Sequence, residues 1–261
     1  MHLSKIEVKV SRAFASGRSA VEELDRKTLF LWIGKIYYGL MFRELFLRSS
    51  QRDPESPSIM DADYLALFSS HHLLLQAARG VVDWREGESP ASFLFFDCQE
   101  SSNNARLNFD YLDIVNLPFL AIRVGSVGVV ACLQDWGRLS GHHTDPVLEM
   151  ARSMVLHPQQ FREVAARAAY AIKRGGDIPG YIPIYGPEVV WVMNPEFLAE
   201  PEENVVAPAD EELYAGLLGM ALLQSPEELH CDGVTLSLLH DKKGRPLRLP
   251  WSVDEWKRVS M

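Results

Sequence analysis

The hydrophobic and polar positions in the first third of the chain repeat with the period of α-helices. A run without proline covers residues 25–49, the proline-containing stretch 50–58 interrupts it, and a second amphipathic pattern covers residues 61–80. Gly34 and Gly39 lie inside the first run, where each glycine costs about 1 kcal/mol relative to alanine. We therefore predict a long helix followed by a second one, with close packing at the two glycines.

Beyond Ser92 the pattern changes to that of β-strands. The aromatic run 93–96 predicts a strand. Two apolar runs, 119–124 and 127–133, flank a two-residue connection with glycine first, which predicts a tight hairpin. Further strands are expected at 189–193, at 233–240 and in a run that ends at Leu249, and further helices at 145–156, 158–174 and 210–224.

The irregular order of these elements favours an α+β fold over a regular βαβ repeat. We expect a helical N-terminal part with a long buried helix, followed by a mixed or antiparallel sheet with hairpins and flanking helices. The corresponding division is a helical subdomain at 1–85 and an α+β subdomain at 86–261, packed as one unit.

The composition is that of a folded protein, because 47% of the 261 residues are hydrophobic and 23% are charged. The net charge of −9 argues against a protein that coats nucleic acid with a cationic surface. The charge is divided unevenly: residues 1–52 hold ten basic and five acidic residues, net +5, which leaves −14 for residues 53–261. The stretch 195–212 holds seven carboxylates and no basic residue, which predicts a solvated acidic surface, with a face for a basic partner as the alternative.

Compartment and membrane signals point to the cytoplasm. Cys98, Cys132 and Cys231 lie far apart without a CxxC pair, so neither a disulfide framework nor a zinc ribbon is indicated. The N-terminus lacks the continuous apolar stretch of a signal peptide. Residues 29–47 approach the length of a membrane span, but three charged side chains interrupt them, each costing about 2.5–3.5 kcal/mol at the bilayer centre. We therefore expect a cytoplasmic protein without a membrane association.

Motifs for common cofactors and nucleophiles are missing from the sequence. It contains no GxxxxGK[ST] loop, no GxGxxG after a strand and no GxSxG elbow. The loop that holds His142, His143 and Asp145 could wrap a metal, but these residues still need a further ligand and a shielded site. We therefore interpret them as exposed loop residues and predict no cofactor.

Four aspartates form a second candidate set. Asp97, Asp110, Asp113 and Asp135 lie in or next to predicted strand ends. If they cluster, they could hold Mg²⁺ for phosphoryl transfer, as in two-metal nucleases. The alternative is that each carboxylate accepts hydrogen bonds from turn amides, as aspartates next to strand ends commonly do.

Four cations form a third set at the basic end of the chain. Lys35 and Arg43 lie within the otherwise apolar long helix, about 12 Å apart, and Arg48 and Arg52 follow it. Buried cations need anions nearby, which are either carboxylates of this chain or phosphates of a ligand. These four residues are the candidate surface for a nucleic acid or an acidic partner.

A resemblance adds to this picture. Residues 31–40 with 43–45, and the later pieces 109–113 and 134–137, resemble the region downstream of HNH endonuclease-like modules in uncharacterised bacterial proteins. The ordered His-Asn-His constellation of the nuclease is absent before Leu31. The resemblance therefore implies kinship with a nuclease-associated module, with a role in genome defence, and transfers no catalytic residue.

These features favour a non-catalytic accessory or binding protein that recognises a partner protein or nucleic acid through its basic N-terminal region. One alternative is a metal-dependent phosphodiesterase or nuclease that uses the four aspartates. Another is a purely structural, oligomerising protein in which the aromatic helix fills a core. The sequence leaves the oligomeric state open.

Overall fold

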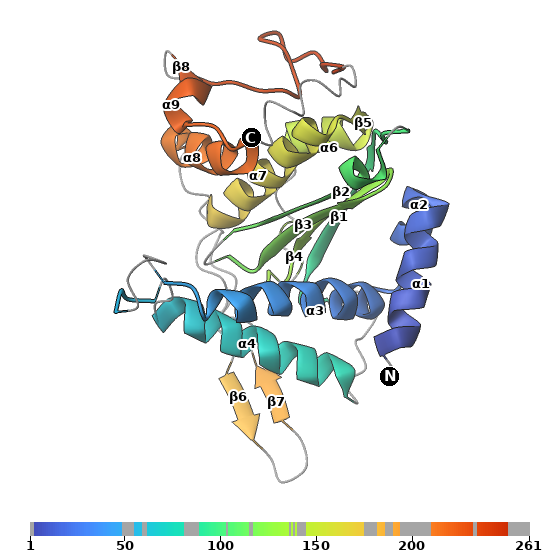
Figure 1. The fold of residues 1–261 in the computed structure, drawn as a ribbon, viewed down its shortest axis with the longest axis vertical. Helices are drawn as coiled ribbons and strands as arrows, with labels where there is room; N and C mark the ends of the chain where they lie inside the picture. Colours follow the sequence, from blue (N-terminus) through green and yellow to red (C-terminus); the bar gives the residue numbers. More distant parts are fainter. Residues whose placement is uncertain are drawn as a thin grey trace, which may run out of the picture.

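The computed structural model describes residues 3–48, 55–58, 62–80, 89–102, 104–114, 117–135, 137, 139, 145–174, 182–185, 190–193, 210–231 and 234–249. Within these ranges a five-stranded sheet lies between two groups of helices (Figure 1). The predicted α+β class is therefore confirmed.

The sheet is mixed. Its strands are β1 (Ser92–Cys98), β2 (Phe109–Asp113), β3 (Phe119–Val124), β4 (Val127–Cys132) and β5 (Val155–Leu156). They are arranged in the order β2-β3-β4-β1-β5, and only the β1–β5 pair is parallel. The predicted hairpin is confirmed, because Val124 pairs with Val127 across Gly125, whose φ of +61° suits glycine.

The N-terminal helices cover one face of the sheet. They are α1 (Leu3–Ser16), α2 (Arg18–Glu22), α3 (Arg26–Glu44) and α4 (Ala62–Arg79). Asp25 begins α3 by accepting a hydrogen bond from Thr28 N at 2.8 Å. Phe30 and Ile33 of α3 share one core cluster with Phe95 and Ile122 of the sheet. The helical part and the sheet are therefore built around a common core.

The two glycines of α3 differ in their packing. A Cβ atom on Gly34 would lie 2.9 Å from Leu75 Cδ2, so this glycine allows α4 to approach closely. A Cβ atom on Gly39 would meet nothing within 4 Å, so the expectation of close packing there is wrong.

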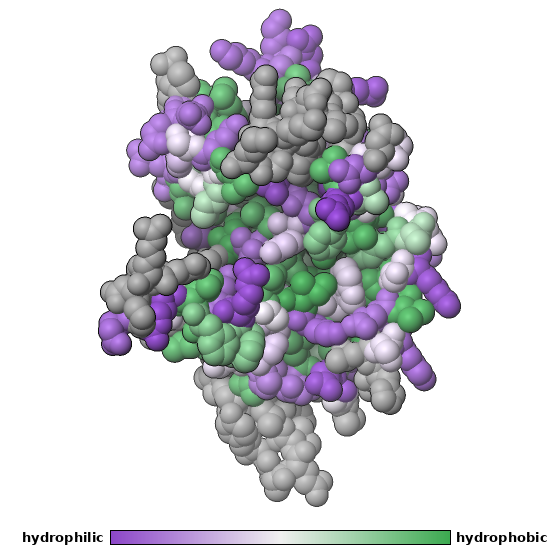
Figure 2. All heavy atoms as spheres, in the orientation of Figure 1, coloured by the Kyte–Doolittle hydropathy of each residue, from purple (hydrophilic) through white to green (hydrophobic). Residues whose placement is uncertain are grey.

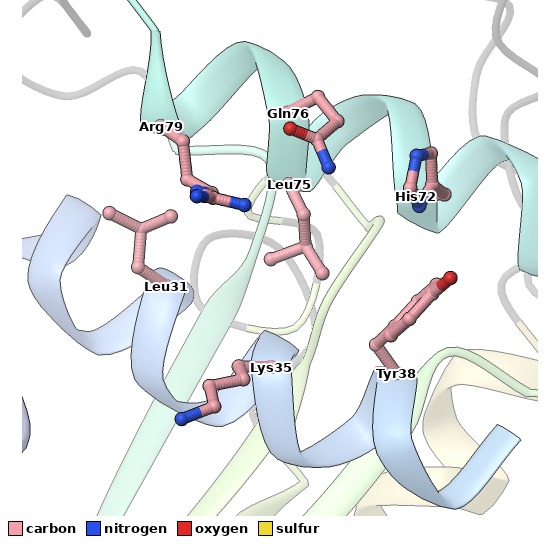
Figure 3. Close-up of a pocket in the computed structure, with 7 residues that line it drawn as sticks. All are labelled: Leu31, Lys35, Tyr38, His72, Leu75, Gln76 and Arg79. Carbon is pink, nitrogen blue, oxygen red and sulfur yellow. The ribbon is translucent and has the colours of Figure 1, made fainter. Parts of the chain in front are cut away.

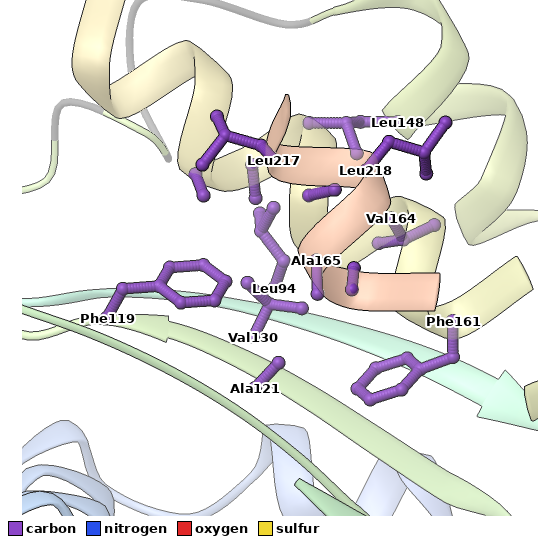
Figure 4. Close-up of a cluster of buried hydrophobic side chains, with 14 of the residues drawn as sticks. Leu94, Phe119, Ala121, Val130, Leu148, Phe161, Val164, Ala165, Leu217 and Leu218 are labelled. Carbon is purple, nitrogen blue, oxygen red and sulfur yellow. The ribbon is translucent and has the colours of Figure 1, made fainter. Parts of the chain in front are cut away.

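The second group of helices covers the other face. It contains α6 (Pro146–Arg152), α7 (Pro158–Arg174), α8 (Glu211–Leu222) and the single turn α9 (Pro226–Leu229). Figure 4 shows Phe119 and Val130 of the sheet pointing toward Ala165 of α7 and Leu217 of α8. The small side chains of α7 allow the sheet and α8 to pack closely against this helix, which completes the second core.

Two predicted elements are wrong in their extent. The helix expected over 145–156 ends at Arg152, and Val155 pairs with Asp97 of β1 instead. Of the strands expected in 233–249, the described residues contain β9 (Val234–Thr235) and one bridge between His240 and Pro246, and β9 pairs with β8 (His230–Cys231).

Side chains of α7 explain why the last segment forms no longer ladder. Gln160 donates to Leu238 O at 2.7 Å and to Leu247 O at 2.8 Å, and Glu163 accepts from Leu238 N at 2.5 Å. Backbone groups that a strand partner would satisfy are therefore bonded to a helix instead.

The remaining described strands, β6 (Ile182–Tyr185) and β7 (Val190–Met193), form a hairpin beside α4 (Figure 1). A strand at 189–193 was predicted, and β7 confirms it. Across the described ranges, we find no helix whose length and apolar character would let it span a bilayer.

Candidate anion-binding face

The four predicted cations have different environments. Lys35 Nζ lies 2.5 Å from Glu7 Oε1 of α1, and both side chains are 49% exposed. Arg43 is exposed in the last turn of α3. Arg48 donates to Ser56 O at 2.8 Å and so closes the loop after α3. Arg52 lies outside the described residues.

Asp97 and Asp110 are held by arginines on opposite faces of the sheet. Asp97 lies 3.4 Å from Arg18 Nη1 on the α2 side. Asp110 accepts two hydrogen bonds of 2.8 Å from Arg162 of α7, in the bidentate geometry of a strong ion pair. Arg123, fully buried opposite Asp110 in the β2–β3 register, donates to the carbonyl of Leu107. Asp97, Asp110 and Arg123 are therefore engaged in contacts that stabilise the fold.

The other two aspartates also serve the fold. Asp135 is buried and accepts hydrogen bonds from Ser92 N and Leu139 N, each at 2.9 Å. Asp113 lies near Glu44 of α3. Burial raises the pKa of Glu44, the hydrogen bond from the Tyr64 hydroxyl lowers it, and the charge of Asp113 raises it further.

The four aspartates do not come together. Asp97 and Asp113 end strands that point to opposite ends of the sheet, and Asp110 faces the opposite layer of helices. Carboxylates in these positions cannot bind a common ion, because a divalent cation needs its ligand oxygens within about 2.0–2.6 Å. The described part of the chain contains no group of three or more His, Cys, Asp or Glu residues that could hold a metal.

The next two candidates, Asp145 and Cys98, also have structural roles. Asp145 is the N-cap of α6 and accepts from Val147 N at 2.8 Å, while His142 and His143 lie outside the described ranges. Cys98 is a buried free thiol, and burial raises its pKa to about 12. Such a thiol stays protonated at neutral pH and is a poor nucleophile.

A pocket of about 120 Å³ lies between α3 and α4. Its lining residues are Leu31, Lys35, Tyr38, His72, Leu75, Gln76 and Arg79 (Figure 3). The spacing i, i+4, i+7 on α3 and i, i+3, i+4, i+7 on α4 places these side chains on the two facing stripes. The accessible lining is almost wholly apolar, although Lys35, Gln76 and Arg79 are among the lining residues.

A row of aromatic rings continues from this pocket, with members on α3, on α4 and in the turn after α3. We call Tyr38, Phe42, Phe46, Phe68 and His72 the aromatic row. The Tyr38 ring stacks on Phe68 and on Phe42, with centroids 4.9 and 6.4 Å apart, and lies 5.4 Å from His72. Phe42 in turn lies 5.4 Å from Phe46. Phe42 is 48% exposed and Phe46 is 71% exposed, so the row opens to the surface.

The pocket and the aromatic row together form what we call the α3–α4 face. Within the described ranges, no carboxylate forms an ion pair with Arg43 or Arg79. In Figure 2, hydrophobic and hydrophilic residues lie side by side at the level of α3 and α4. The face therefore offers cations next to exposed rings.

Sequence reasoning found only part of this face. The stripe of Lys35, Tyr38 and Phe42 on the long helix stood out by its spacing, but Gln76 and Arg79 were missed. The amphipathic spacing of α4 was the signal that could have found them, because the residues next to Leu75 on that stripe must also approach α3.

Comparison with known proteins adds no assignment to this geometry. No protein-family model, no curated protein and no solved structure matches this chain.

Proposed function

We propose that this protein is a non-catalytic binding protein whose α3–α4 face recognises an anionic macromolecule. The observation that carries the proposal is the placement of Lys35, Arg43 and Arg79 around an apolar pocket and the exposed rings beside it. These cations belong to a chain with a net charge of −9, so they are a local exception to an acidic molecule.

Long-range electrostatics favours such an arrangement. Each exposed cation alone contributes little, because water and salt screen it. Several cations on one face act together, since a polyanion that binds them releases its condensed counterions. The expected interaction is therefore strongly dependent on salt.

The other candidate groups support a binding role over a catalytic one. Asp110 is engaged by Arg162, and Asp135 accepts backbone hydrogen bonds. Cys98 is protonated at neutral pH because burial raises its pKa to about 12. These groups stabilise the fold where they lie, and they would have to leave their present contacts to act on a substrate.

The cellular setting of this proposal comes from the sequence. The resemblance to regions downstream of HNH endonuclease-like modules implies an accessory role beside a nuclease in the cytoplasm of a bacterium. In that setting the partner would be a nucleic acid or an acidic protein subunit. Purification from the native host, with identification of co-eluting protein and nucleic acid, tests this part of the proposal.

A salt titration with a labelled polyanion tests the binding face directly. Heparin is a suitable first probe, because it carries negative charge without bases. We expect the double variant Arg43→Glu, Arg79→Glu to lose affinity and to lower the slope of log affinity against log salt by about 1.4–1.8. Both side chains are exposed, so the fold should remain intact.

The matched control is Lys242→Glu, Lys243→Glu. It makes the same change in net charge in an exposed turn beside the segment that Gln160 of α7 holds, across the sheet from α3 and α4. Equal losses in the two double variants would show that net charge alone decides binding. An affinity that does not change with salt would also contradict the proposal.

A further inference from the structure

We infer that the anionic partner is a single-stranded nucleic acid whose bases stack on the aromatic row while its phosphates contact Lys35, Arg43 and Arg79. This inference rests on the proposed function and names the chemistry of the ligand. Stacking needs ring faces open to solvent, and cation contacts need charges next to those rings. The α3–α4 face supplies both.

The rings follow one another from the pocket to the end of α3. Tyr38 and Phe42 lie one turn apart on α3, and Phe46 follows in the turn after α3, with its ring at 73° to that of Phe42. Single exposed apolar residues are common on protein surfaces and require no explanation. Here two exposed rings are neighbours, with Phe42 at 48% and Phe46 at 71%, and they continue a row of ring contacts that begins with Tyr38 at the pocket.

Cations flank this row of rings. Arg43 follows Phe42 on α3, about 100° further around the helix. Lys35 lies one turn before Tyr38, and Arg79 reaches the pocket from α4 (Figure 3). A strand that follows the rings therefore meets positive charge at both ends of its path. This combination of a charged track and stacking rings is the general solution for binding single strands.

The pocket gives the path a defined end. Leu31 and Leu75 provide an apolar floor, and Tyr38 provides a ring as one wall. His72 and Gln76 complete a lining whose accessible surface is almost wholly apolar. A base that turns into the pocket would therefore find apolar surface for its plane.

Other polyanions fit this face less well. A duplex keeps its bases stacked on one another, so the exposed rings would gain no partner. An acidic polypeptide could pair with the cations, but its carboxylates do not stack on rings. Binding that depends on the rings therefore distinguishes a single strand from a duplex and from an acidic polypeptide.

The test measures fluorescence anisotropy of the full chain with labelled oligothymidylate, on the order of 10 nucleotides long. Polyglutamate and a duplex of the same length serve as comparison polyanions. The variant is Phe42→Leu, Phe46→Leu, which keeps apolar side chains at both exposed positions but removes their π faces. We expect it to bind oligothymidylate about tenfold more weakly or worse, with an unchanged salt slope and unchanged polyglutamate binding.

A second aromatic pair provides the control. Phe109 and Tyr111 are exposed on the edge strand β2, with ring centroids 6.3 Å apart, and Phe109→Leu, Tyr111→Leu should leave oligothymidylate affinity unchanged. Thermal unfolding of all variants identifies any loss of affinity that comes from a loss of fold.

The outcomes separate the inference from the proposed function. Binding of heparin that depends on Arg43 and Arg79, with no preference for oligothymidylate and no effect of the ring variant, would overturn the inference and leave the proposed function standing. Tighter binding of polyglutamate than of oligothymidylate would identify an acidic protein partner and would also overturn the inference. No binding to any polyanion would overturn both.

Discussion

His71 lies between α3 and α4, next to the face that we propose for binding. Its Nε2 atom is 2.9 Å from the Gly34 carbonyl, to which the neutral ring donates, and its buried Nδ1 atom has no hydrogen-bond partner in the described structure. Burial lowers the pKa of His71 to about 4, although the hydrogen bond to Gly34 raises it. The fold therefore holds this histidine neutral.

The pH dependence of stability should show this effect. The stability contributed by neutral His71 is fully present above the unfolded pKa of 6.5 and is lost as pH falls toward the folded pKa of about 4. A shift of this size corresponds to about 3 kcal/mol. Urea unfolding at several pH values should show a shallower loss in His71→Gln, which keeps a donor for the Gly34 carbonyl but cannot titrate.

The adjacent histidine provides the comparison. His72 is half-buried at the pocket, and His72→Gln should retain the acid dependence of the natural chain. Equal pH slopes in His71→Gln and the natural chain would show that His71 does not control the acid stability.

At the scale of elements, one buried carboxylate ties three segments together. Glu163 of α7 is fully buried and accepts hydrogen bonds from Arg167, from Ser237 at 2.7 Å and from the Tyr214 hydroxyl of α8 at 3.3 Å. It also accepts from Leu238 N. The C-terminal segment therefore depends on α7 for bonds that a strand partner would otherwise provide.

Removing this charge should loosen the C-terminal segment selectively. Glu163→Gln leaves Arg167 with the longer contact to Asp145, 3.5 Å away, and with its position over the Tyr214 ring, and should lower the free energy of unfolding by about 3 kcal/mol. Hydrogen exchange should become faster at Leu238, while heparin binding by the α3–α4 face should not change. An equal increase in the exchange rate at all measured amides of the variant would contradict this local role.

Local signals account for the elements that were predicted correctly. The hairpin of β3 and β4 depends on a two-residue turn whose glycine is visible in the sequence, and the limits of α4 follow from a single amphipathic pattern. The strand β5 was missed because two residues carry no period of their own. It exists because β1 offers a parallel edge to Val155 and Leu156.

At the scale of the whole molecule, the sheet separates layers of different charge. Residues 3–48 contain nine basic and five acidic residues, whereas the full chain has a net charge of −9. With α4, this layer has ten basic and six acidic residues, whereas residues 145–174, 210–231 and 234–249 of the other layer hold nine of each. The layer formed by α1 to α4 therefore has an excess of positive charge, and its own carboxylates decide how many of its cations remain available. Glu7, which pairs with Lys35, is one of these carboxylates.

Removing Glu7 should strengthen binding. In the natural chain Glu7 competes with a phosphate for Lys35. In Glu7→Gln this competition is removed, so affinity for oligothymidylate should rise several-fold and the salt slope should steepen by up to about 0.7. The pair is half exposed, so the change in stability should stay below about 1 kcal/mol. Glu149→Gln, which breaks the exposed Arg152–Glu149 pair on α6, is the control, and an equal gain there would contradict a specific role for Lys35.

By itself, the sequence determined the fold class, the long helix, the tight hairpin and the unusual stripe on α3, because periodicity and turn chemistry are properties of neighbouring residues. Only the tertiary structure decided which distant side chains meet. It joined Asp110 to Arg162, 52 positions along the chain, and placed Arg79 across from Lys35. Such contacts depend on how helices and sheet pack around two cores, and that packing is a property of the whole chain.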